Sequence, residues 1–82
     1  MKKSAIIMLQ IMQASTKRVM EQDLEVPMDI AAERVIAAIA KAYHLGPPAA
    51  YLMCETPIVL IRGGKTLAEY GVHDGSTIRY IY

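Results

Sequence analysis

The last third of the chain, residues 60–82, constrains the fold more than any other stretch. A short apolar run, Ile58 to Ile61, stops at the adjacent glycines Gly63-Gly64. A second turn signal, Asp74-Gly75, stands just before a stretch rich in β-forming residues, Thr77 to Tyr82. Glycine and aspartate at such positions favour tight turns, and β-branched and aromatic residues favour strands. The pattern predicts two strands joined through two tight turns.

Between those turns lies a compact segment, Thr66 to Val72, which predicts a short helical turn. This order of elements leaves a space between the two strands that apolar side chains must fill. We expect Leu67, Tyr70 and Val72 to fill it and to be largely buried.

Length and composition predict one globular domain covering residues 1–82. Hydrophobic residues make up 54% of the chain and charged residues 21%, so a core can form and disorder is not expected. The formal net charge is +1, and no stretch reads as a run of Lys or Arg. This balance argues against a nucleic-acid partner, because a nucleic-acid binder needs a basic surface.

The single cysteine, Cys54, cannot form an internal disulfide, which favours a reducing, cytoplasmic location. The N-terminal residues, Met1 to Met12, imitate a secretory signal with a basic start and an apolar centre. Gln10 interrupts that apolar part, which is also too short to cross a membrane. We therefore expect an opening β-strand and no direct membrane insertion.

The first 26 residues alternate in a way that predicts an antiparallel hairpin over residues 4–26. A polar break, Gln13 to Arg18, provides the turn, and it lacks an Asn-Gly or Asp-Gly signal that would define the register. In the returning strand, Leu24 and Val26 are expected to point inward and the acidic residues outward. In the opening strand one side carries Ile7, Leu9 and Ile11, and the other carries Ile6, Met8, Gln10 and Met12.

An amphipathic helix is predicted from Ile30 to His44, because this stretch is rich in alanine and has no Gly or Pro. Pro27 should end the preceding strand, and Asp29 should cap the helix. Gly46 and Pro47-Pro48 should stop it. The apolar face at helical spacing comprises Ala32, Val35, Ile36, Ile39 and Tyr43.

Three strands follow the helix: Tyr51 to Glu55, Ile58 to Ile61 and Thr77 to Tyr82, with a turn at Thr56-Pro57. The predicted order is β-β-α-β-β-β, an α+β fold in which one helix lies across a mixed sheet. The first and last strands can then pair in parallel.

The segment Thr66 to Ile78 resembles the closing segment of ubiquitin-like β-grasp proteins. Within that group the chain is most similar to the small proteins of the YukD/EsaB type, which accompany type VII (WXG100, ESX-like) secretion systems of Gram-positive bacteria. The resemblance rests on Pro47-Pro48, on the short link from Leu60 to Leu67, and on Leu67, Gly71-Val72 and Asp74-Gly75. The chain departs from the family at Ser76, where an acidic residue is common.

This resemblance implies a bacterial, cytoplasmic accessory protein that is not conjugated to other molecules and acts by docking on a protein partner. The partner would be a component or regulator of the secretion apparatus. Two alternatives stay open: a ubiquitin-like modifier or sulfur carrier that needs C-terminal processing, and an unrelated β-grasp binding module. Genes for a WXG100 protein and a membrane ATPase nearby would favour the first reading.

No residue pattern predicts catalysis, a cofactor or a metal site. Gly63-Gly64 resembles the diglycine of ubiquitin, but conjugation needs a glycine carboxylate at a free end, and here the pair is internal. Cys54 has no histidine near it in sequence to act as a base, so we expect a small core residue. His44 and His73 lack metal-ligand spacing and are expected at a helix end and a turn. The chain is therefore predicted not to be an enzyme.

The candidate functional residues are those that alternation places on the sheet face away from the helix. Met and Ile side chains with one Arg are typical of a protein-binding patch. A one-residue error in register would move them to the core, and they could also pack among themselves. Self-association stays open. The predicted protein-binding residues are Ile6, Met8, Met12, Arg79 and Ile81.

Overall fold

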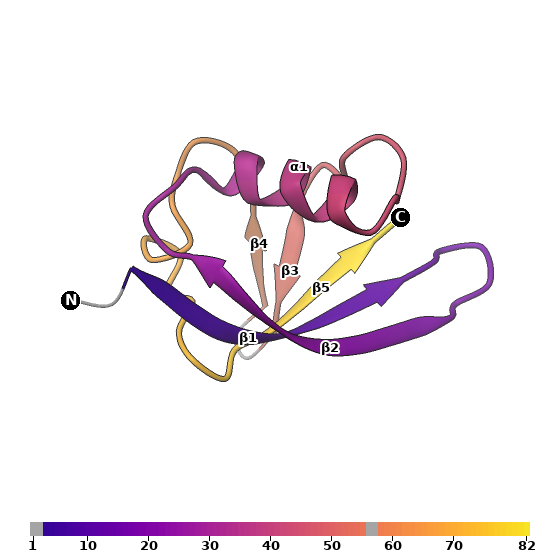
Figure 1. Ribbon diagram of the computed structural model, residues 1–82, viewed down its shortest axis with the longest axis horizontal. Coiled ribbons are helices and arrows are strands. Elements are labelled where there is room, and N and C mark those ends of the chain that lie inside the picture. Colours follow the sequence, from indigo (N-terminus) through magenta and orange to yellow (C-terminus); the bar gives the residue numbers. More distant parts are fainter. Residues whose placement is uncertain (1–2, 56–57) are drawn as a thin grey trace.

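The computed structural model describes residues 3–55 and 58–82. Figure 1 shows one helix lying across one face of a strongly twisted sheet. In chain order the elements are β1 (Ser4–Met12), β2 (Val19–Pro27), α1 (Ala32–Ala42), β3 (Leu52–Cys54), β4 (Val59–Ile61) and β5 (Thr77–Ile81).

The five described strands form one mixed sheet in the order β2-β1-β5-β3-β4. β1 pairs in parallel with β5, and the other neighbours are antiparallel. The predicted α+β fold, its element order and the parallel pairing of the first and last strands are therefore confirmed. No helix within the described ranges is long and apolar enough to cross a membrane.

The hairpin register, left open by the sequence, places Leu9 opposite Gln22 and Ile11 opposite Met20. Ile7, Leu9 and Ile11 are buried beneath the helix, as predicted. Of the two inward residues predicted in β2, Val26 is buried and Leu24 is half-buried against the core. β2 ends at Pro27, also as predicted. The alternation was thus assigned to the correct faces.

The helix is shorter than predicted, Ala32–Ala42 rather than residues 30–44, and Asp29 does not cap it. Ala31 occupies the N-cap position without a side-chain hydrogen bond. Backbone carbonyls from the loop after β4 satisfy the first amides instead: Ala32 N–H donates to Lys65 O at 2.8 Å and Glu33 N–H to Gly63 O at 3.0 Å. A contact distant in sequence therefore replaces the local cap.

The C-terminus of α1 also ends before the predicted stop at Gly46. His44 adopts the left-handed conformation, with φ 56°. The amide of Leu45 donates to Ala40 O at 2.9 Å and that of His44 to Lys41 O at 3.4 Å. This is the pattern of a Schellman motif, with histidine at the position where glycine is usual.

The segment between β4 and β5 fills the core as expected from Leu67 and Val72, which are both buried. Tyr70 is half-buried rather than enclosed, and its hydroxyl donates to Arg62 O at 2.7 Å. Ser76 is buried, and its Oγ accepts a hydrogen bond from the His73 amide at 3.0 Å. Ser76 therefore closes the turn before β5.

The last three strands are shorter than predicted by one or two residues at their ends. Tyr51 and Glu55 lie outside β3, Ile58 lies outside β4, and Tyr82 lies outside β5. Tyr82 still donates its amide to Met12 O at 3.0 Å. The predicted turn at Thr56-Pro57 lies outside the described residues.

Candidate protein-docking face

The face of the sheet away from α1, called here the open face, is built mainly from β1, β2 and β5. Strand pairing sets Met8 beside Thr77, and Met12 beside Ile81. All five residues predicted to bind a partner lie on this face: Ile6, Met8, Met12, Arg79 and Ile81.

Their exposure is unequal. Ile6 has 54% of its surface exposed. Met8, Met12, Arg79 and Ile81 are half-buried. The register thus leaves these residues on the face that the helix does not cover, and none of the five is fully buried.

A line of polar side chains crosses the open face at right angles to the strands. Arg79 is at its centre, donating to Gln10 Oε1 from Nε at 3.3 Å and Nη2 at 3.2 Å. The same Nη2 forms an ion pair with Glu55 Oε1 at 3.3 Å. Gln10 Nε2 donates to Glu21 Oε2, also at 3.3 Å. We call Glu21, Gln10, Arg79 and Glu55 the polar row.

The polar row divides the apolar residues of the face into groups. Toward the hairpin end, Met12 lies between Val19 and Ile81 on the neighbouring strands. At the opposite end are Ile6 and Met8. The arrangement gives a partner two apolar contacts with a charged line between them, which would fix its orientation.

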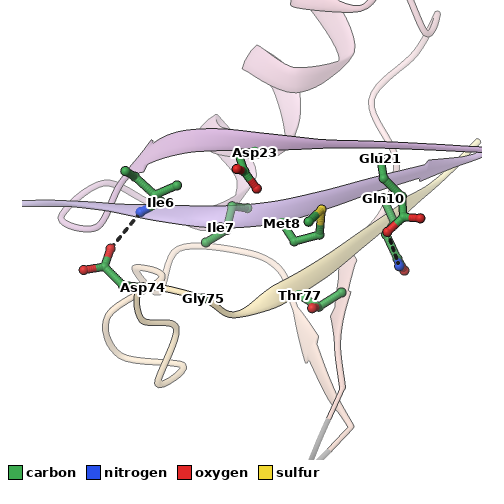
Figure 2. A pocket seen from close by; sticks show the side chains of 9 residues that line it. All are labelled: Ile6, Ile7, Met8, Gln10, Glu21, Asp23, Asp74, Gly75 and Thr77. Atoms are coloured by element: carbon green, nitrogen blue, oxygen red, sulfur yellow. Dashed lines mark hydrogen bonds between the residues drawn. The ribbon is translucent and has the colours of Figure 1, made fainter.

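Near Ile6 and Met8 the open face is hollowed, with a volume of about 560 Å³. Figure 2 shows Asp23 and Glu21 from β2 at one side of the hollow and Thr77 from β5 at the other. Asp74 Oδ1 accepts the Ile6 amide at 2.8 Å, so the turn before β5 is tied to β1. The hollow is therefore lined by apolar residues of β1 and is acidic on its β2 side.

Sequence reasoning missed several residues of this face. Met53 pairs with both Arg79 and Leu60, and 45% of the Leu60 surface is exposed. These residues extend the face onto β3 and β4. The order of those strands in the sheet was not predicted, so their side chains could not be assigned to the face. Alternation in β2 was read correctly, but its acidic residues were not recognised as neighbours of Met8.

The residues considered for chemistry occupy structural positions. Cys54 is half-buried against the core, where desolvation by burial, and then the nearby Glu55 carboxylate, raise the pKa of its thiol. A raised pKa disfavours the thiolate that nucleophilic chemistry needs. Gly63 lies in the turn after β4, and its carbonyl accepts the helix amide described above.

The histidines do not meet as a site. His44 is exposed at the helix end, and His73 Nδ1 lies 2.8 Å from Asp74 O. Within the described ranges, no group of three or more His, Cys, Asp or Glu side chains has an arrangement that could hold a metal ion.

No protein-family model matches this chain, and no curated protein matches it either. Solved structures do match. A de novo design based on ubiquitin aligns with a TM-score of 0.62 and 20% identity, over 96% of this chain and 88% of the design.

The C-terminal ubiquitin-like domain of mouse tubulin-specific chaperone e aligns with a TM-score of 0.60 and 14% identity, over 100% of this chain and 91% of that one. At these identities the likeness shows the fold alone. The fold is a ubiquitin-like β-grasp.

Proposed function

We propose that this protein is a non-conjugated, non-catalytic accessory protein of a bacterial type VII secretion system, acting in the cytoplasm by docking on a protein partner. The ubiquitin-like fold supports a binding role, because domains of this fold commonly mediate protein interactions. The secretion system is inferred from the resemblance carried by Pro47-Pro48 and by the segment from Leu67 to Gly75. The partner would be a component or regulator of the secretion apparatus.

The observation that carries the docking role is the exposure of Ile6 on a sheet face that the helix does not cover. Ile6 lies beside the half-buried Met8, and burying this apolar surface against a partner favours binding, because it removes the surface from water. The strands hold the face rigid, so little conformational entropy is lost there on binding. Methionine side chains can adapt to the partner's shape.

The polar row would determine the orientation of the bound partner rather than add much binding affinity. Glu21 and Glu55 accept hydrogen bonds or ion pairs within the row through one carboxylate oxygen each. The remaining acceptor capacity suits donors on a partner. Matched donors would select one orientation, because a shifted partner would leave buried charges unpaired.

Gly63-Gly64 does not support the alternative role of modifier or sulfur carrier. The Gly63 carbonyl is already used at the start of α1. An unrelated β-grasp binding module would use the same open face, so the identity of the partner separates that reading from the proposed one.

The test replaces Ile6 by glutamate in cells that carry the secretion system, and measures secretion of the system's substrates. A charge without a pair on a surface that must lose water opposes binding. We expect secretion to fall at least about tenfold while the cellular level of the protein stays normal. Met8→Glu and Ile81→Glu should act in the same direction, with some loss of stability because both residues are half-buried.

The matched control is Ala37→Glu, which adds the same charge to an exposed position of α1. This variant should secrete normally. Normal secretion by stably folded Ile6→Glu would show that the open face is not the working surface. Loss of secretion in both variants alike would point to a general effect of added charge and would also contradict the proposal.

A further inference from the structure

The hairpin strand β2 forms one edge of the sheet, and its residues are mostly exposed. In an antiparallel pair, alternate residues direct their backbone groups toward the partner strand and away from it. The Met28 amide donates to Lys3 O at 2.8 Å and the Gln13 amide to Arg18 O at 3.0 Å. These two bonds show that the even-numbered residues of β2 are the ones that form hydrogen bonds with β1. The backbone N–H and C=O groups that point away from β1 belong to Val19, Glu21, Asp23 and Glu25.

The same positions carry a row of negative charge. Glu21, Asp23 and Glu25 are exposed, and successive members are about 7 Å apart along the strand. Glu25 accepts a hydrogen bond from the Ser4 hydroxyl at 2.9 Å, and Glu21 accepts one from the neutral Gln10 amide. In the part of the chain that the structure describes, no Lys or Arg forms an ion pair with these three carboxylates. Their charge is therefore available to a partner.

The other side of the same edge is apolar. A groove of about 200 Å³ runs between β2 and α1, with Leu24 and Val26 on the strand side. On the helix side Ala38 and Ala42 are exposed, and their small side chains leave space beside the strand. A strand added to β2 would direct every second side chain into this groove.

We propose that β2 accepts, by strand addition, an extended segment of a partner protein in which basic and apolar residues alternate. The basic side chains would face Glu21, Asp23 and Glu25 on the open-face side, and the apolar ones would enter the groove. Backbone hydrogen bonds supply affinity in this binding mode, and alternate side chains supply specificity. A second copy of this chain does not fit, because pairing β2 with β2 would set acidic residues opposite one another. The proposal does not depend on the secretion role.

The probe is a synthetic peptide about as long as β2, with Lys at every second position and Val or Ile between. Amide hydrogen exchange of the full chain is measured by NMR with and without the peptide. We expect exchange to slow at Glu21, Asp23 and Glu25 on binding. Gln22 and Leu24 should change little, because their amides already face β1. A peptide of the same composition with its Lys and apolar residues in separate blocks is the control and should bind at least about tenfold more weakly.

Two substitutions at Asp23 separate backbone pairing from charge. Asp23→Pro removes an amide that points away from β1, which an edge strand tolerates, and should abolish binding. Asp23→Asn keeps that amide and should weaken binding only a few-fold. Equal affinity of the two variants would overturn strand addition.

Charge reversal tests the chemistry of the partner. The triple variant Glu21→Lys, Asp23→Lys and Glu25→Lys should lose about tenfold or more in affinity for the Lys peptide and should bind a peptide with Glu in place of Lys. The gained binding also shows that the variant is folded. Unchanged preference, equal binding of the block peptide, or slowed exchange in β5 instead of β2 would overturn the proposal.

Discussion

The turn after β4 contains the adjacent glycines Gly63 and Gly64. This motif serves the backbone conformation of the turn rather than a chemical reaction. Gly63 has φ +75°, a conformation that side chains rarely adopt, whereas Gly64 does not have a positive φ. A Cβ at either position would meet no heavy atom within 4 Å. For an alanine substitution, the two positions therefore differ in backbone conformation and not in the space available to a Cβ.

This difference predicts that Gly63→Ala lowers the free energy of unfolding by about 1 kcal/mol, because alanine is strained at positive φ. Gly64→Ala should stay within roughly 0.5 kcal/mol of the parent protein. Urea unfolding of both variants measures this. Equal effects would contradict the assigned role of Gly63 in the turn that caps α1.

Leu67 is the residue by which the sequence most directly predicted the fold, and it is 0% exposed. Leu67→Ala should cost about 2–4 kcal/mol, the range for a well-packed core leucine, because the shortened side chain leaves a cavity. Thermal or urea unfolding provides the measurement. A cost below about 1 kcal/mol would mean that the segment between β4 and β5 does not hold the core together.

At the scale of elements, the sequence located each described strand and the helix, but it misplaced both ends of α1 and β3 and one end each of β4 and β5. Apolar periodicity identified α1, since the residues that face the sheet recur at helical spacing. Its start depends on carbonyls of Gly63 and Lys65, which come from a loop some thirty residues further along the chain. No local signal reports such a contact, so the plausible cap at Asp29 was wrong. Its end depends on His44 taking a conformation that sequence rules assign to glycine.

The end of α1 yields a stabilising substitution. His44→Gly should raise the free energy of unfolding by about 0.5–1 kcal/mol, because glycine adopts positive φ without strain. His44→Val should lower it, since a β-branched residue is the least suited to this conformation. Differential scanning calorimetry of the two variants provides the comparison. A destabilised His44→Gly variant would show that the imidazole makes a contribution larger than the backbone strain.

At the scale of the whole molecule, alternation predicted which strand residues face the helix and which face outward. It assigned Ile6, Met8 and Met12 to the open face because a strand with one covered face must alternate. The polar row was beyond sequence reasoning. Gln10 and Arg79 are 69 positions apart, and their contact depends on the register between β1 and β5. The packed core sets the register between distant strands, and no sequence signal near either residue indicates it.

In the proposed arrangement, the helix-covered face of the sheet stabilises the fold and the open face binds a partner. Ile6 and Ile7 are neighbours on β1, yet Ile6 is 54% exposed and Ile7 is 1% exposed. Equilibrium urea unfolding of Ile6→Glu and Ile7→Ala tests the division most directly. We predict a change within roughly 0.5 kcal/mol for Ile6→Glu and a loss of about 2–5 kcal/mol for Ile7→Ala. A loss of about 2 kcal/mol or more for Ile6→Glu would place Ile6 in the core and contradict the account.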